Sequence, residues 1–369
     1  MSPPGRPEGV GQRLKPEGSA MTPWGRPKGL HRRARPEGPL AASPGRTTGG
    51  YRVAPSEGTP MNLTFQGVAF SALAWLSIVI SLGLPRLDAQ VQLVALSPLI
   101  LLLGVPHGAL DLVFVRQLTS VRSAAGWIIF TIAYFAAAAL VVGLWWVSPG
   151  VFLATFLLIS ALHFSGDPEG RTPALFRMLY GGAVIFCPLT LHAAEVSELF
   201  AYLAGAPAAQ AIVAALQWAA WPWVAAIGIV AIVGAKRDLV RSVELVSMAA
   251  LLSFTPPLIG FTIFFCCMHS ARHVLRTRDY SHAGTFRHLF NIAAWPMLVT
   301  GIGVAIVWWL SDGKPLDMRI AQLVFVGLAA LTVPHMLVVE RVRFSGWIIG
   351  KRDRIGSAST SLQGVTNDR

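Results

Sequence analysis

Long apolar stretches follow one another along the chain from residue 65 onwards, and this succession constrains the fold more than any other feature. A transmembrane α-helix needs about 20 predominantly apolar residues to cross the hydrocarbon layer of a bilayer. Transmembrane β-strands are about half as long and alternate polar with apolar residues, which these stretches do not. The sequence therefore predicts an all-α fold, a polytopic integral membrane bundle of about eight to ten transmembrane helices. The expected spans are residues 65–84, 91–115, 124–147, 150–164, 174–192, 208–234, 243–273, 289–310 and 320–339.

The overall composition agrees with a membrane protein. Hydrophobic residues make up 54% of the chain and charged residues only 13%, whereas soluble domains carry about 25% charged residues. This balance excludes an ordinary soluble enzyme, a coiled coil and a wholly disordered chain. The three cysteines lie inside apolar segments without a CxxC motif, so we expect them to pack as small core residues.

Residues 1–60 differ from the rest of the chain. A four-residue motif of the type Arg-Pro-Glu-Gly recurs here, and the segment holds 10 Lys/Arg against 4 Asp/Glu. A segment so rich in proline and glycine cannot bury a core, so we expect a disordered basic extension. Alternatively, translation starts at Met61, immediately before the first apolar stretch. The transmembrane domain is then expected over residues 61–345, followed by a polar cytoplasmic tail at 346–369.

The charges of the loops predict the orientation of the chain. Cations gather in every second loop and in the tail, and such loops face the cytoplasm. We therefore expect a multi-pass protein of the cell (inner or plasma) membrane with both termini cytoplasmic. The net charge of +12 could suggest a nucleic-acid partner. The chain shows no nucleic-acid-binding module, so anionic lipid headgroups are the expected partner of these cations, and nucleic acid is not.

Residues 243–273 conflict with a single crossing. The loops on both sides of this stretch are basic, so the stretch must cross the membrane twice or turn back within it. It is too short for two full spans, and Pro256-Pro257 at its middle would break a helix. We therefore expect two short helices, or a re-entrant pair, with the prolines at the turn.

Histidines inside apolar segments are the strongest functional signal, because ionisable groups in membrane helices are costly. The chain has nine histidines, and five lie within or at the ends of predicted spans: His107, His163, His269, His273 and His335. With two helices in residues 243–273, loop charge places all five toward the cytoplasmic ends of their helices. A single crossing there would put His269 and His273 on the opposite side from His107 and His163.

The spacing of these histidines is typical of a metal site. His269 and His273 are four residues apart, so both rings can face one ion. Asp111 follows His107 by four residues, and Asp167 follows His163 by four. A carboxylate there could accept the second ring N–H of a metal-bound imidazole, which is a common outer-shell contact.

Three further residues lie near this pattern. We expect His335 to support the site or face the substrate rather than bind metal. Arg272 is expected to lie on another helical face as a lipid-headgroup anchor. Cys266 shares the face of His269, and we expect it to pack there. A lone histidine in a membrane helix often only makes a hydrogen bond to a neighbouring helix. The prediction of a metal site therefore depends on the histidines as a set.

The residue types do not select one metal. An all-imidazole site suits zinc, copper, iron or nickel. The absence of HExxH from the sequence argues against a zinc protease. A single HxxxH without HxxHH argues against a membrane desaturase or hydroxylase, which uses about eight histidines.

Four short motifs, taken in order, resemble a known family. They are Pro-His-Gly-Ala-Leu-Asp at 106–111, His-Phe-Ser-Gly-Asp at 163–167, His-Ser-Ala-Arg-His at 269–273 and Pro-His-Met at 334–336. This set resembles the bacterial and archaeal Brp/Blh-type β-carotene 15,15′-dioxygenases over about residues 65–340. The resemblance implies a non-haem Fe²⁺ enzyme that cleaves the central double bond of β-carotene with O₂ to give two molecules of all-trans-retinal. It also implies that His107, His163, His269 and His273 are the iron ligands and the catalytic residues.

Further expectations concern the substrate and the partners. β-Carotene dissolves in the bilayer, so the enzyme would take it laterally from lipid, and a microbial rhodopsin would accept the retinal. Two alternatives stay open: a non-enzymatic transporter or rhodopsin-assembly protein, and an iron oxygenase acting on another carotenoid. The aromatic residues considered as polyene contacts are Phe164, Phe261, Phe264, Phe265 and Trp127.

Overall fold

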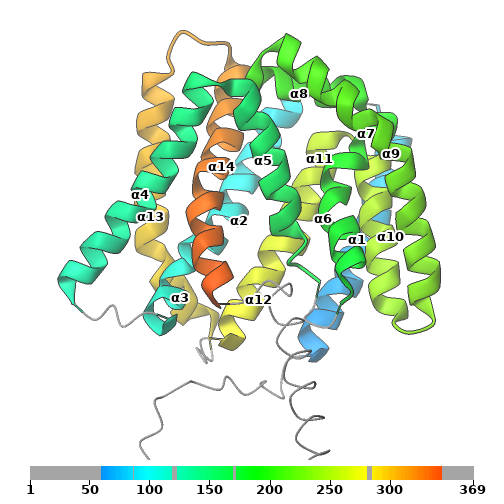
Figure 1. The fold of residues 1–369 in the computed structure, drawn as a ribbon, viewed down its shortest axis with the longest axis horizontal. Helices are drawn as coiled ribbons and strands as arrows, with labels where there is room; N and C mark the ends of the chain where they lie inside the picture. Colours follow the sequence, from blue (N-terminus) through cyan, green and yellow to red (C-terminus); the bar gives the residue numbers. More distant parts are fainter. Residues whose placement is uncertain (1–59, 86, 119–122, 169–171, 281–284, 343–369) are drawn as a thin grey trace, which may run out of the picture. The chain divides into compact units, whose positions relative to one another are not determined.

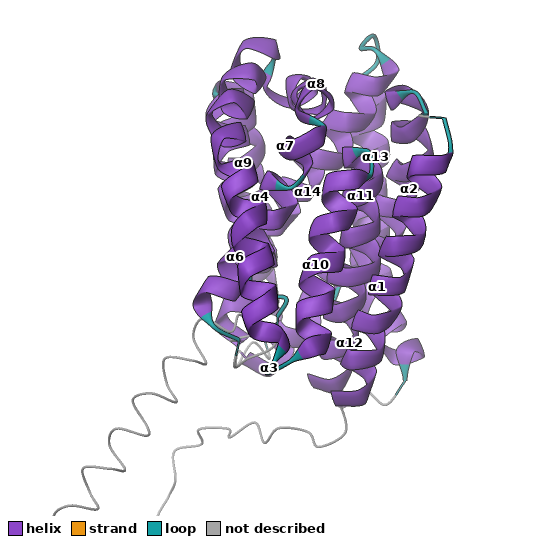
Figure 2. Cartoon of the chain, turned by 90° about the vertical axis from the view of Figure 1, so that its right-hand side faces the viewer, coloured by secondary structure: helices purple, strands orange, loops and turns teal. Residues whose placement is uncertain are grey.

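The computed structural model describes residues 60–85, 87–118, 123–168, 172–280 and 285–342. Throughout these ranges the regular elements are helices, and no strand is present (Figure 2). The elements in chain order are α1 Pro60–Gly83, α2 Ala89–Ala109, α3 Asp111–Leu118, α4 Ala124–Val147, α5 Pro149–Phe164, α6 Ala174–Phe186, α7 Pro188–Leu191, α8 Ala193–Ala204, α9 Ala206–Ala235, α10 Leu239–Phe254, α11 Pro257–Ile263, the π-helix η1 Phe264–Ser270, α12 Ala271–Tyr280, α13 Phe286–Leu310 and α14 Leu316–Val342.

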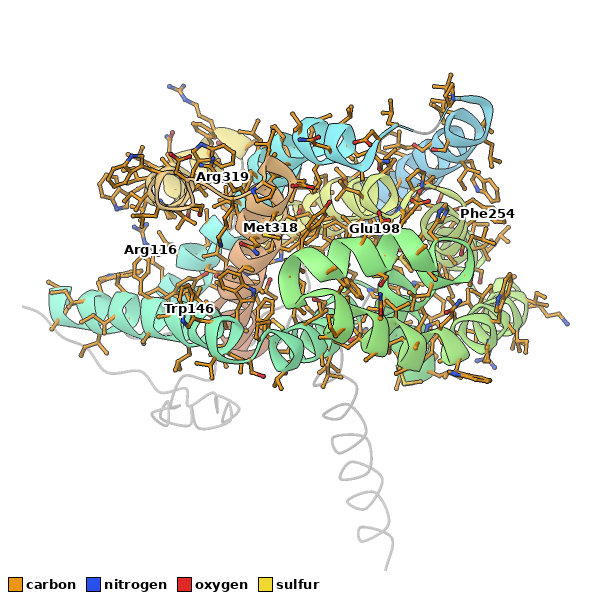
Figure 3. All side chains as sticks on the ribbon, turned by 90° about the horizontal axis from the view of Figure 1, so that it is seen from above. Arg116, Trp146, Glu198, Phe254, Met318 and Arg319 are labelled. Atoms are coloured by element: carbon orange, nitrogen blue, oxygen red, sulfur yellow. The ribbon has the colours of Figure 1, made fainter. Side chains whose placement is uncertain are left out.

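The described helices confirm the polytopic membrane bundle. Eight of them, counting helices that continue into one another as one span, are long and apolar enough to cross a membrane. The helix α5 is apolar but shorter. Large apolar side chains point outward from the bundle, among them Trp146 on α4 and Phe254 on α10 (Figure 3). A surface of this kind is suited to lipid rather than to water.

Successive long helices run in opposite directions, so α1 begins and α14 ends at the lower end of Figure 1. The turn that carries Lys236 and Arg237 between α9 and α10 lies at that same end, as does the cationic helix α12. Two basic segments of the described chain therefore lie at the same end of the helices. The side of the membrane that this end faces stays a prediction, because residues 1–59 and 343–369 lie outside the described residues. The expected disordered extension and polar tail fall in those ranges.

The stretch around Pro256-Pro257 does form a helical hairpin, as predicted. Helix α10 ends at Phe254 and α11 begins at Pro257, where proline fits the first turn of a helix. Both arms are longer than expected. Helix α10 starts already at Leu239, and the second arm continues without a break through η1 and α12 to Tyr280.

The main core lies where α6, α10 and the second arm of the hairpin meet. Its largest side chains are fully buried and include Tyr180, Met248 and Phe264. A close approach of α5 and α6 borders this core. A Cβ atom added to Gly181 would lie 2.0 Å from the carbonyl oxygen of Ala161 and 2.7 Å from the backbone nitrogen of Ser165. Only glycine allows this approach, which brings the turn after α5 against the core.

Candidate metal centre

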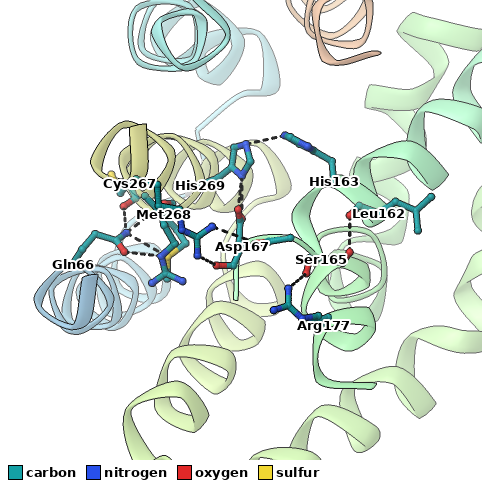
Figure 4. Close-up of polar contacts among 12 residues, drawn as sticks. Gln66, Leu162, His163, Ser165, Asp167, Arg177, Cys267, Met268 and His269 are labelled. Atoms are coloured by element: carbon teal, nitrogen blue, oxygen red, sulfur yellow. Dashed lines mark hydrogen bonds and ion pairs between the residues drawn. The ribbon is translucent and has the colours of Figure 1, made fainter. Parts of the chain in front are cut away.

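Two imidazoles from different helices face each other inside the bundle. His163 lies in the last turn of α5, and His269 lies in the π-helix η1. Their Nε2 atoms are 3.1 Å apart, and the His269 residue is only 2% exposed. Figure 4 shows the His269 ring between His163 on one side and Asp167 on the other.

Asp167 fixes the orientation of the His269 ring. Both carboxylate oxygens of Asp167 lie near Nδ1 of His269, at 2.9 and 3.0 Å. A carboxylate accepts hydrogen bonds, so Nδ1 carries the proton and Nε2 presents its lone pair toward His163. This carboxylate–imidazole arrangement is the one that orients metal-bound histidines in proteins.

Two arginines hold the turn that carries Asp167. Arg276 on α12 donates to the backbone carbonyls of Gly166 and Asp167. Arg177 donates to the carbonyls of Thr172 and Ser165, at 3.2 and 3.3 Å. Arg177 is 1% exposed and therefore lies inside the protein. The polar turn, held against the core by Gly181, supplies the carbonyls that satisfy this guanidinium.

A second carboxylate–imidazole pair repeats the arrangement nearby. Nδ1 of His335 on α14 lies 2.6 Å from Oδ1 of Asp111, at the start of α3. The other carboxylate oxygen of Asp111 accepts a hydrogen bond of 3.1 Å from the hydroxyl of Tyr134 on α4. His335 and Asp111 are buried. The consecutive helices α3 and α4 thus meet the distant helix α14 at one carboxylate.

Ring contacts join the two pairs into one cluster. The ring centroids of His163 and His269 are 4.7 Å apart, and those of His163 and His335 are 5.3 Å apart. His273 on α12 lies 5.1 Å from His335 and also contacts Phe114. Four of the five histidines singled out by the sequence therefore come together. We call His163, His269, His273 and His335 the histidine cluster.

The fifth histidine, His107, lies in α2, but its side chain is outside the described side chains. The position of its ring relative to the histidine cluster therefore stays a prediction. Among the side chains that the structure does describe, His, Cys, Asp and Glu form no group of three that could hold a metal ion. The described part of the centre supplies one facing pair of donors, His163 and His269.

The donor chemistry of this pair fits a metal ion. Two nitrogen ligands at about 2.0–2.1 Å from one ion, at angles from about 90° to 109°, lie about 2.8–3.4 Å apart. The 3.1 Å separation of the two Nε2 atoms falls within this range. Imidazoles backed by carboxylates suit iron as well as zinc, copper or nickel.

Each carboxylate contacts a histidine other than the one four residues before it. Asp167 contacts His269, and Asp111 contacts His335 on another helix. The suggested pairing of Asp111 with His107 stays a prediction, because the His107 side chain lies outside the described ones. The rule that residues four apart share a face holds only within one helix. Helix α5 ends at Phe164, and α2 ends at Ala109, so both carboxylates lie beyond the helix that carries the preceding histidine.

The expected role of Arg272 as a lipid-headgroup anchor was wrong. Arg272 is only 4% exposed, and its guanidinium pairs with the buried carboxylate of Glu244 on α10. It is therefore not a lipid-headgroup anchor. Cys266 is buried and its Sγ lies 3.7 Å from the carbonyl oxygen of Leu99, in agreement with a packing role.

Sequence reasoning missed three polar residues that shape the centre. They are Tyr134, which contacts Asp111, and Glu244 and Gln66, which both contact Arg272. The available signal was the same one that identified the histidines. Each is a polar residue in or beside an apolar stretch, where an unpartnered polar group is costly.

An apolar pocket opens beside His163. It contains about 1030 Å³ of space that no atom fills, part of it open to the surroundings. Phe164, Phe261 and Phe265 line it together with His163. Of the other two aromatic residues considered at the sequence level, Phe264 lies in the core and Trp127 packs beside Phe114 and Phe130. Neither lines the pocket.

Comparison with known proteins decides the family. A family model described as β-carotene 15,15′-dioxygenase matches residues 98–342. The chain belongs to the β-carotene 15,15′-dioxygenase family. The matched range includes every histidine of the cluster as well as His107.

Two curated relatives agree with this family. A β-carotene 15,15′-dioxygenase from the uncultured marine bacterium 66A03 is 27% identical over 251 residues, which are 66% of this chain and 90% of that protein. A probable β-carotene 15,15′-dioxygenase Blh from Halobacterium salinarum is 25% identical over 319 residues, or 73% of this chain and 90% of that one. No solved structure matches the chain.

Proposed function

We propose that this chain is a membrane-embedded non-haem iron enzyme that cleaves the central 15,15′ double bond of β-carotene with O₂, giving two molecules of all-trans-retinal. The observation that carries the proposal is the facing pair of His163 and His269, of which His163 lines an apolar pocket. The family membership supplies the reaction, and the pocket is suited to an apolar substrate.

We propose that His107, His163, His269 and His273 bind Fe²⁺. When bound, the iron supplies the site at which O₂ reacts. The carboxylate of Asp167 keeps the proton of His269 on Nδ1 and so keeps Nε2 available as a ligand. Asp111 likewise orients the ring of His335, which borders His163 and His273 and supports their rings.

The pocket would hold part of the polyene beside these imidazoles. Its wall on α5 runs from Phe156 to Phe164, a length of about 12 Å at 1.5 Å per residue. Aromatic side chains such as Phe261 and Phe265 offer flat apolar faces to a conjugated chain. Apolar walls also exclude water from the reaction.

The proposed location follows from the same chemistry. β-Carotene and retinal both partition into lipid, so substrate and product would enter and leave through the cell membrane. A microbial rhodopsin in that membrane is the proposed acceptor of the retinal. The cationic end of the bundle, and with it both termini, would face the cytoplasm.

Expression in a bacterium that accumulates β-carotene tests the proposal. The wild-type chain should bleach the cells, and chromatography should identify retinal as the product. His163→Ala and His269→Ala should each abolish the product while the protein remains in the membrane. His288→Ala is the matched control, because His288 is exposed on α13 away from the cluster.

The possible results of this expression experiment lead to different conclusions. Bleaching without retinal would replace the proposed reaction by transport, or by cleavage at another bond or of another carotenoid. Full activity of both variants would refute the ligand assignment. An iron-free, inactive wild-type protein would refute the enzyme itself.

A further inference from the structure

A buried polar network joins α1, α10 and the segment that carries His269 and His273. Arg272 on α12 donates through both terminal nitrogens to Glu244 on α10, at 2.8 and 2.7 Å. Its third nitrogen, Nε, donates to Oε1 of Gln66 on α1 at 3.0 Å. The residues Arg272 and Glu244 are 4% and 7% exposed. A charge pair at such depth is costly unless its hydrogen bonds are satisfied.

Gln66 connects this charge pair to the π-helix. Its side-chain nitrogen donates to the carbonyl of Cys267 at 2.8 Å and lies 3.3 Å from that of Met268 (Figure 4). The two ends of the amide therefore have different partners. The oxygen must face the guanidinium and the nitrogen must face the carbonyls, so the contacts themselves fix the orientation of the amide.

The π-helix determines where the two histidines of this segment point. Helix α11 changes into η1 at Phe264, and η1 changes back into an α-helix at Ala271. His269 lies within the π-helix and His273 lies after it. Such turns disturb the regular hydrogen bonding of the helix, and their carbonyls need other donors where no water is present.

We propose that Gln66, Arg272 and Glu244 form a positioning network, which we call the π-helix clamp. The clamp holds the carbonyls of Cys267 and Met268 in η1. It also anchors Arg272, the residue just before His273, to α10. It thereby keeps the His269 ring facing His163 and the His273 ring beside His335. The part of this inference that concerns iron rests on the proposed function. The part that concerns the π-helix does not.

Gly67 lies against the contact between Arg272 and Glu244 and offers a second way to test it. A Cβ atom added there would lie 2.6 Å from Oε2 of Glu244 and 3.4 Å from the guanidinium of Arg272. A carboxylate held by two hydrogen bonds cannot move away freely. Gly67→Ala should therefore disturb the clamp without removing any of its polar groups.

Two substitutions of Gln66 test the clamp. Gln66→Leu removes both functions of the amide. Gln66→Glu keeps an acceptor for Arg272 but cannot donate to the carbonyls of Cys267 and Met268. The matched control is Trp75→Phe, which removes a hydrogen bond of 3.1 Å between Trp75 and Ser247. That bond joins the same pair of helices, α1 and α10, but does not involve the π-helix.

The first measurement is hydrogen–deuterium exchange of residues 264–273 in the metal-free, detergent-purified full chain. Both Gln66 variants and Gly67→Ala should exchange faster there than the wild type, whereas Trp75→Phe should not. The elution volume of each purified variant shows that it is folded. Unchanged exchange in folded Gln66→Leu would overturn the clamp.

The second measurement concerns the metal. Titration with Fe²⁺ should show about 10- to 100-fold weaker binding by Gln66→Leu than by wild type, the loss typical of outer-shell changes. The visible spectrum of the Co²⁺-loaded protein should change as well, because it reports the geometry of the ligands. Unaltered binding and spectrum would overturn the positioning role. A wild-type chain that binds no iron would refute the proposed function, while the exchange result would still decide the clamp.

Discussion

The carboxylate of Asp111 lies 2.6 Å from Nδ1 of His335, a residue 224 positions further along the chain. This contact connects α3 with α14, and the hydroxyl of Tyr134 extends it to α4. It gives His335 the same environment that Asp167 gives His269. The outer layer of the centre is therefore assembled between helices, and each carboxylate can be tested separately.

Asp111→Asn should lower retinal formation about 10- to 100-fold, because an amide holds the His335 ring less firmly than a carboxylate does. Tyr134→Phe removes only one donor from the same carboxylate and should have a smaller effect. Initial rates of product formation, corrected for protein in the membrane, check both. Equal rates for Asp111→Asn and wild type would mean that His335 needs no carboxylate.

Asp167→Asn should weaken iron binding through His269. In a double-mutant cycle with His269→Ala, the effects on iron affinity should not add, because the carboxylate acts through that ring. Metal content of the purified proteins, measured by elemental analysis, gives the comparison. Additive losses would show that Asp167 acts on the centre by some other route.

Narrowing the apolar pocket should select against long substrates. Leu199→Trp introduces a larger side chain into the lining and should raise KM for β-carotene more than for a shorter apocarotenoid. Iron content should stay unchanged. Ile229→Trp is a control, because Ile229 faces outward and is 63% exposed. The same change in KM for both substrates would argue against this pocket as the binding site.

The stability of the protein should fall at high pH through Tyr202. Burial and its hydrogen bond to Asp317 raise the pKa of Tyr202 to about 12. The unfolded chain loses this proton at about pH 10. The contribution is therefore complete below about pH 10 and is lost as the pH rises toward 12. Thermal unfolding in detergent should show a smaller decline above pH 10 for Tyr202→Phe than for wild type.

Removal of the metal should destabilise the protein, since an ion bound only by the folded state adds to its stability. A chelator should lower Tm of the wild-type protein, and added Fe²⁺ should restore it. His269→Ala should show neither change. A wild-type Tm that is insensitive to both treatments would argue against a metal held by this cluster.

Local sequence signals were sufficient for the long apolar helices, although no predicted span includes the short helix α8. Apolar length predicted the spans, loop charge required two helices around residues 243–273, and Pro256-Pro257 placed the turn between them. Each of these signals depends on residues that are close in sequence. The polytopic bundle and the hairpin could therefore be predicted.

The contacts of the centre could be predicted only in part. Histidines in apolar stretches were recognised because each is costly on its own. Their partners could not be assigned, because Asp167 reaches His269 and Asp111 reaches His335 across helices whose packing no local pattern encodes. The π-helix could not be predicted either, because the donor that supports it, Gln66, is about two hundred residues away.

The π-helix has a consequence for how this segment can change. Converting residues 264–270 into a regular α-helix would require the loss of one residue. Everything after the deletion would then rotate by about 100° around the helix axis. That rotation would carry Arg272 away from Glu244 and turn His273 away from its neighbours at once. Insertions and deletions here are therefore constrained in length as strictly as the histidines are constrained in identity.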